Sequence, residues 1–509
     1  MKSVYAAGMF CALLFCGCAT PLTPYNLLVR WGSDEPLKDR LEKSRKLIED
    51  RKNQAYSFTL AEKAAIFEVE QNFFCLPAPF ETFTSRTLYS GTADRISASP
   101  SFLSENLTML AFKYAAMKDV ESVKEASQLL EMFLWVDDQF GKRGQWPASI
   151  QISRQPIPQS AKNNLIYIGN GPYGYLYFTD DAHGNTVSPH FLGAYLAYHS
   201  FDDPKIRAQA VEVIRRNIVY LLDEGFVLKK LNGEPTTYGG LSGDEYWGFA
   251  TNALVARLMF LEVARVVLEE DGKTGDRELL SRIRKDLEKL YKDGFPERLE
   301  KISPHIVNFW FSTPSSNARI FRNFYLLLLA GGDSENGNSY REAFQYQWLQ
   351  FREDHNPFLS FLYLSLIPIE QWTFKDRLAK AIALEYLKSA PLDRDDRELL
   401  NSFFDDDDID IDRLPRVYKF KLEPKNKIPL PLYRRGIRRN EWSAEPHRLN
   451  EHLGENGSNL NSPIDFLTAY YLGLASGFIP IEEQKVDIEK VERYLKEALP
   501  MFEKYRYKH

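Results

Sequence analysis

The sequence predicts an all-α protein, an (α/α)6 toroid of six inner and six outer helices, with long loops on one face and little β structure. Three observations predict this fold. Helical periodicity recurs along the chain, apolar segments alternate with amphipathic ones, and short connections alternate with long ones. The chain has 509 residues, more than one ordinary core holds, and a closed toroid accommodates that length in a single unit. An open α-solenoid, which also stacks helix pairs, is the alternative.

One helix pair displays the repeating pattern most clearly. Residues 188–200 are apolar nearly all round, which is typical of a helix buried on every side. The following segment, residues 204–224, carries apolar residues along one face only. Asp203 is suited to the N-cap of this second helix, Pro204 to its first position and Gly225 to its end. The two segments therefore predict an inner helix followed by an outer one.

Five more segment pairs have the same order, an apolar helix and then an amphipathic one: residues 104–118 with 119–141, 251–268 with 276–294, 318–332 with 339–354, 356–367 with 372–390, and 462–479 with 487–505. A further helical segment, residues 35–74, precedes them, and residues 414–424 are the best strand candidate, expected in a hairpin. The connections that lead into an inner helix are long, and a toroid places them all at one end. Function usually lies on loops held by a rigid scaffold, so this end is where a site is expected.

The first residues predict the compartment. Lys2 precedes an apolar run, residues 4–15, which is too short to cross a bilayer as a helix and suits a signal peptide. The run ends in LLFCGC, which resembles a bacterial lipobox with Cys18 at the acylation position; an ordinary secretory signal is the alternative. The resemblance implies a signal peptide over residues 1–17 and a membrane anchor at Cys18. Since Ala19 follows the cysteine, it also implies the outer membrane of a Gram-negative bacterium. We further expect a tether and helical segment over residues 18–90 and the toroid over residues 91–509.

Composition excludes several classes of function. The formal net charge is −6 and the basic residues form no stripe, which argues against a nucleic-acid partner. The sequence has no HExxH motif and no cysteine cluster, so we expect no metal and no cofactor. Aromatic residues make up 14% of the chain, and they either fill a bulky core or provide surfaces for stacking on sugar rings.

The layout of these segments resembles a poorly characterised family of secreted bacterial (α/α)6 proteins, distantly similar to carbohydrate-processing toroid enzymes. The resemblance rests on residues 189–239, 251–264, 351–366, 429–442 and 465–479. In that family an Asp-Glu pair precedes the histidine that opens the inner helix. Aligning on His190 places Asn185 and Thr186 at the pair, so neither carboxylate is present there.

The candidate site comes from two stretches at the loop-bearing end. A glycosidase needs two carboxylates across the scissile bond, and we expect the catalytic residues among Asp181, His183, Asp244 and Glu245. We expect the substrate to be bound by His190, Tyr238 and Trp247, the last two by stacking on sugar rings. The alternative is that the acids cap helices and that His190 is a hydrogen-bonded residue of the inner wall. The sequence thus leaves two functions open: a carbohydrate-active hydrolase or lyase at the cell envelope, or a non-catalytic lipoprotein that binds glycan or supports envelope assembly.

Overall fold

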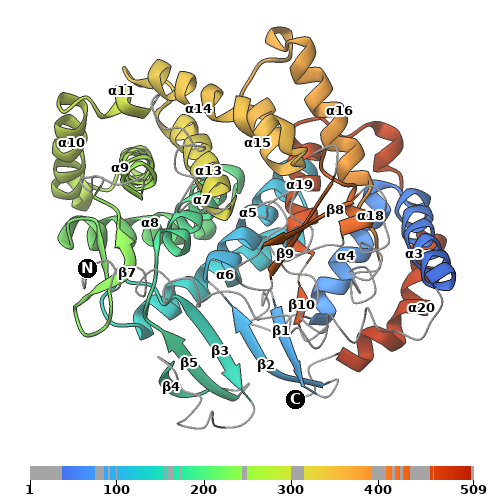
Figure 1. Cartoon of the computed structure of the whole chain (residues 1–509). Helices are drawn as coiled ribbons and strands as arrows, with labels where there is room; N and C mark the ends of the chain where they lie inside the picture. Colours follow the sequence, from blue (N-terminus) through green and yellow to red (C-terminus); the bar gives the residue numbers. More distant parts are fainter. Residues whose placement is uncertain are drawn as a thin grey trace, which may run out of the picture.

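The structure, a computed structural model, describes most of the chain: residues 37–74, 85–89, 92–98, 100–153, 156, 165–171, 174–242, 249–299, 314–392, 409–414, 419–424, 428–435, 459–461 and 463–505. These residues are mostly helical, as predicted (Figure 1). The longer helices are α3 (Leu37–Ser57), α4 (Leu60–Phe74), α5 (Pro100–Met117), α6 (Val120–Gln139), α7 (Gly184–Ser200), α8 (Pro204–Asp223), α9 (Phe249–Asp271), α10 (Arg277–Lys292), α13 (Pro314–Gly331), α14 (Gly337–Phe351), α15 (Pro357–Ser365), α16 (Phe374–Lys388), α19 (Ile464–Ala475) and α20 (Ile488–Tyr505).

The helix boundaries follow the local signals in the sequence. The Asp203 carboxylate accepts hydrogen bonds from the amides of Lys205 and Ile206, at 2.8 and 3.0 Å, and so caps α8. Pro204 occupies the first turn, and Gly225 follows the helix with a φ of +61°. Helix α7 begins at Gly184, about one turn before the predicted start. The stretch before His190 is therefore partly helix rather than loop.

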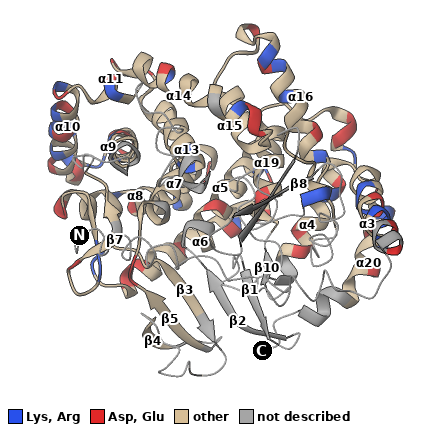
Figure 2. Cartoon of the chain, viewed as in Figure 1, with Lys and Arg blue, Asp and Glu red and all other residues tan. Residues whose placement is uncertain are grey.

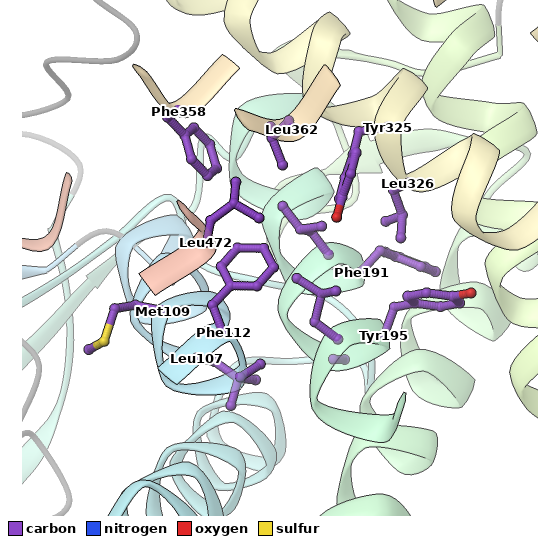
Figure 3. Packing of buried hydrophobic residues seen from close by; sticks show 14 of the residues in the cluster. Leu107, Met109, Phe112, Phe191, Tyr195, Tyr325, Leu326, Phe358, Leu362 and Leu472 are labelled. Carbon is purple, nitrogen blue, oxygen red and sulfur yellow. The ribbon is translucent and has the colours of Figure 1, made fainter. Parts of the chain in front are cut away.

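The apolar helices pack mainly against one another. Helix α5 contacts α7 and α19, α9 contacts α7 and α13, and α15 contacts α13 and α19. Side chains from five of these helices meet in one cluster (Figure 3): Leu107, Met109 and Phe112 of α5, Phe191 and Tyr195 of α7, Tyr325 and Leu326 of α13, Phe358 and Leu362 of α15, and Leu472 of α19. The space between these helices is thus filled by apolar and aromatic side chains.

The amphipathic helices lie outside this core. Helix α6 packs on α5, α8 on α7, α10 on α9, α14 on α13 and α16 on α15. Charged residues are frequent on outlying helices such as α3 and α10, whereas α5 and α7 contain few (Figure 2). None of the helices in the described part of the chain has the length and apolar character that crossing a membrane requires.

The sixth pair differs from the prediction. Helix α20 packs chiefly on α4, and it is α4 that lies against α19, where the Phe67 and Phe466 rings are 4.9 Å apart. The Lys63 ammonium of α4 donates to the carbonyl of Ala390 at 2.7 Å, just after α16. The N-terminal helices therefore pack directly on C-terminal elements, across the boundary expected near residue 90.

A six-stranded antiparallel sheet, which the sequence analysis did not anticipate, lies beside the helices (Figure 1). Its strands, in spatial order, are β10 (Asn459–Asn461), β1 (Ser85–Tyr89), β2 (Thr92–Ala98), β3 (Ser149–Ser153), β5 (Gly174–Thr179) and β4 (Leu165–Gly171). All of them come from the connections that precede α19, α5 and α7. The long connections of three neighbouring helices thus associate into one sheet.

Two hairpins complete the described strands. Strands β8 (Ile409–Leu414) and β9 (Lys419–Pro424) pair antiparallel, so the expected hairpin is present, but the strand predicted over residues 414–424 is shorter and begins at Lys419. Strands β6 (Val227–Lys229) and β7 (Pro235–Gly240) form the second hairpin, between α8 and α9. This second hairpin carries the contacts of the candidate site.

Candidate functional site

The predicted site residues that the structure describes surround the start of α7. Asp181 and His183 lie in the short segment between β5 and α7, and His190 lies in the second turn of α7. Tyr238 is part of β7, but its side chain is outside the described residues. Asp244, Glu245 and Trp247 lie outside the described residues entirely, as do Cys18 and Cys75.

The two aspartates of this segment hold the β6–β7 hairpin. The Thr237 amide and hydroxyl donate to the two carboxylate oxygens of Asp181, at 2.8 and 2.7 Å. The amide of Leu231 donates to the Asp180 carboxylate at 3.1 Å. These hydrogen bonds join the start of α7 to the hairpin that precedes α9.

The environment of Asp181 favours its charged form. Partial burial acts to raise the pKa of Asp181, but the hydrogen bonds from Thr237 and the Lys230 ammonium, 3.8 Å away, outweigh it and hold the pKa below its usual value. A general acid needs the opposite shift, because it must stay protonated near neutral pH. The geometry gives this carboxylate the character of a structural hydrogen-bond acceptor.

His190 is enclosed in the core. Its exposed fraction is 0%, its ring stacks on Trp146 with centroids 3.9 Å apart, and its Nδ1 atom is hydrogen-bonded to the Ser104 hydroxyl. Burial lowers the pKa of His190 to about 3, so the imidazole is neutral at physiological pH. A side chain without exposed surface cannot touch a ligand unless the core rearranges. This placement is that of a packed core histidine, the alternative considered for it.

His183 precedes the first residue of α7 and occupies its N-cap position without capping the helix through its side chain. Its Nδ1 atom is buried and has no hydrogen-bond partner within the described ranges. Burial lowers the pKa of His183, the nearby Arg319 charge lowers it further, and Asp181 opposes both. His183 is therefore a mainly neutral imidazole next to a guanidinium that comes from α13.

Arg319 was not predicted for this site. The sequence offers only a weak signal, because Arg319 is one of two arginines in the first half of α13. Three tyrosines that alternate along the strands were not predicted either, Tyr167 of β4 with Tyr175 and Tyr177 of β5. Their period of two over residues 165–179 is the pattern of a strand with two different faces.

The described residues contain no group of three or more His, Cys, Asp or Glu side chains arranged to hold a metal ion. Comparison with known protein families, curated proteins and solved structures found no match to this chain.

Proposed function

We propose that this chain is a cell-envelope lipoprotein whose (α/α)6 toroid binds glycan without cleaving it. The toroid is supported by the order of contacts among the apolar helices. Helix α5 is followed around the core by α7, α9, α13, α15 and α19, and α19 contacts α5 again. In this arrangement α6, α8, α10, α14 and α16 are outer helices, and α4 takes the outer position at α19.

The observation that carries the non-catalytic proposal is the state of Asp181. Both of its oxygens accept hydrogen bonds from Thr237 and its pKa is held low. His190, the second titratable group expected at the start of α7, is buried and neutral. A hydrolase would need a protonated acid across from a carboxylate, and the described residues around α7 provide no such pair.

Glycan binding is supported by three tyrosines of β4 and β5: Tyr167, Tyr175 and Tyr177. Tyr167 stands opposite Tyr177 in the β4–β5 register, with ring centroids 5.4 Å apart, and its ring is 6.3 Å from that of Tyr175. Leu176 and Phe178 alternate with these tyrosines and join the core on the other side of the sheet. Tyr177 is buried, whereas Tyr167 is 49% exposed, so the aromatic surface that the C–H face of a sugar ring can reach is that of Tyr167.

Replacing Tyr167 by alanine is expected to weaken glycan binding about twofold to tenfold, because an aromatic contact contributes about 0.5 to 1.5 kcal/mol. Binding is measured by affinity electrophoresis on a panel of neutral and acidic polysaccharides. The matched control is Tyr346→Ala, on outer helix α14, where the tyrosine is 40% exposed.

The same samples are assayed for new reducing ends and for unsaturated products. Release of either by the wild type, and its loss in Asp181→Asn, would show an enzyme and refute the proposal.

Membrane anchoring is tested at Cys18. The Gly17–Cys18 junction after a short apolar run motivates the expectation that this cysteine becomes an acylated N-terminus. Metabolic labelling with a radioactive fatty acid is expected to mark the wild type and not Cys18→Ala. Cys75→Ala serves as the control and should be labelled like the wild type. Equal labelling of Cys18→Ala would contradict a lipid anchor at this position.

A further inference from the structure

Arg319 differs from the other arginines that lie between the helices. Arg215 pairs with Asp276 at 2.8 Å, Arg257 with Asp286 at 2.9 Å and Arg265 with Glu262 at 2.8 Å. Arg319, by contrast, has no hydrogen bond, ion pair or ring stacking with any part of the chain that the structure describes. A guanidinium surrounded by protein costs free energy unless an anion compensates it, and no anion of the described chain does so here.

The guanidinium of Arg319 lies at the first turn of α7. A Cβ atom placed on Gly184 would be 3.4 Å from Nη1 of Arg319 and 3.1 Å from a methyl carbon of Leu241. Glycine therefore leaves space where any other residue would contact the guanidinium. The Arg319 side chain is half-buried, so it retains some accessible surface, and burial lowers its pKa to about 10.

A second orphaned group lies at the same place. His183 is adjacent to Gly184, and its buried Nδ1 atom has no partner in the described ranges. His183 also leaves the first amides of α7 without a side-chain cap, and the N-terminus of a helix carries partial positive charge. Two groups that favour an anion thus converge, a guanidinium and the start of a 17-residue helix, and the unpaired Nδ1 atom of His183 adds a donor to them in its N–H tautomer.

The charges indicate which kind of anion fits. Arg319 contributes one positive charge, and His183 is mainly neutral because burial and Arg319 keep its pKa low. Asp181, whose charge also acts on His183, already accepts two hydrogen bonds from Thr237, and the Lys230 ammonium 3.8 Å away offsets its charge. One net positive charge matches a singly charged group such as a carboxylate better than a phosphate dianion.

We propose that Arg319, His183 and the N-terminus of α7 form a binding site for a singly charged oxyanion, the carboxylate of an acidic sugar. The oxyanion part of this proposal rests on Arg319 and His183 alone. The sugar part rests on the proposed function above. The Arg319 guanidinium would hold both carboxylate oxygens, and the first amides of α7 would donate to the same group.

Calorimetric titration of the detergent-solubilised full chain tests the site with sodium glucuronate, sodium acetate and glucose. We expect the wild type to bind glucuronate more tightly than acetate, and Arg319→Met to lose at least tenfold in affinity for both. The control is Arg341→Met, on outer helix α14, which should bind like the wild type because this arginine is exposed. Glucuronate binding unchanged by Arg319→Met, or no binding of either anion by the wild type, overturns the proposal. Acetate binding that depends on Arg319 without a preference for glucuronate supports the oxyanion site and refutes the sugar part alone.

Thermal unfolding separates a binding role from a structural one. Without ligand, Arg319→Met is expected to melt a few degrees above the wild type, because it removes a cation that has no partner. Glucuronate should raise the melting temperature of the wild type and not that of the variant. A variant that melts well below the wild type would show that Arg319 stabilises the fold through the chain itself, and the proposal would be wrong.

Discussion

Glu262→Ala is expected to lower the free energy of unfolding by about 3 to 5 kcal/mol, the cost of breaking a buried charge pair. Glu262 is 0% exposed and lies in α9. Its carboxylate accepts from Arg265 at 2.8 and 3.0 Å, from the Tyr291 hydroxyl of α10 and from the Tyr340 hydroxyl of α14 at 3.4 Å. Alanine leaves the arginine and both hydroxyls without this acceptor inside the protein, and it loosens the contact of three helices.

The matched control for this prediction is Glu269→Ala. Glu269 accepts from Arg265 and from Arg284, each at 2.9 Å, but is 31% exposed, so its loss should cost about 1 kcal/mol or less. Urea unfolding followed by circular dichroism measures both variants. Burial is the first cause that raises the pKa values of Tyr291 and Tyr340, so both tyrosines stay protonated donors throughout the accessible pH range. If Glu262→Ala and Glu269→Ala lower the free energy of unfolding equally, burial of Glu262 does not determine how much its carboxylate stabilises the fold.

Gly144→Ala is expected to destabilise the protein by about 3 to 5 kcal/mol, because two separate costs add. Gly144 has a φ of +84°, in the left-handed region that side chains disfavour. A Cβ atom there would also lie 2.1 Å from the carbonyl oxygen of Arg216 in α8, a backbone atom that cannot move aside. Displacing this turn breaks the hydrogen bond from the Gly144 amide to the buried Asp137 carboxylate.

Gly225→Ala isolates the contribution of the clash. Gly225 also has a positive φ, +61°, but a Cβ atom there meets no other atom within 4 Å. This variant should lose only about 1 kcal/mol, the cost of the left-handed conformation. Both variants are compared by urea unfolding, and equal losses would contradict the clash. Both glycines have a positive φ, so a larger loss at Gly144 reports the close approach of α8.

The helices could be predicted from the sequence because their signals are local. Asp203, Pro204 and Gly225 define α8 through groups within a few residues of its ends, and the apolar period marks the face it buries. Strand β9 and its place in a hairpin were predictable for the same reason, since its partner β8 lies close by in the chain. These features depend on backbone hydrogen bonds and side-chain periodicity over one element.

The six-stranded sheet was not predictable in this way. Strand β1 pairs with β10, near the other end of the chain, and the alternation in β4 and β5 indicates strands without indicating which strands pair. The place of α4 between α19 and α20 has the same origin. The sequence shows α19 followed by an amphipathic α20, but which helix covers α19 is decided by packing among segments far apart in sequence.

The candidate site was likewise predictable in part. The sequence by itself determined the residue types before α7 and in its first turns, including Asp181, His183 and His190. Only the tertiary structure decided their surroundings: Thr237 engages Asp181, Trp146 and Ser104 enclose His190, and α13 brings Arg319 to His183. Charge state and exposure depend on neighbours from distant segments, because burial and nearby charges shift a pKa and remove a side chain from solvent. The sequence therefore does not determine charge state or exposure directly, because both depend on how the helices pack.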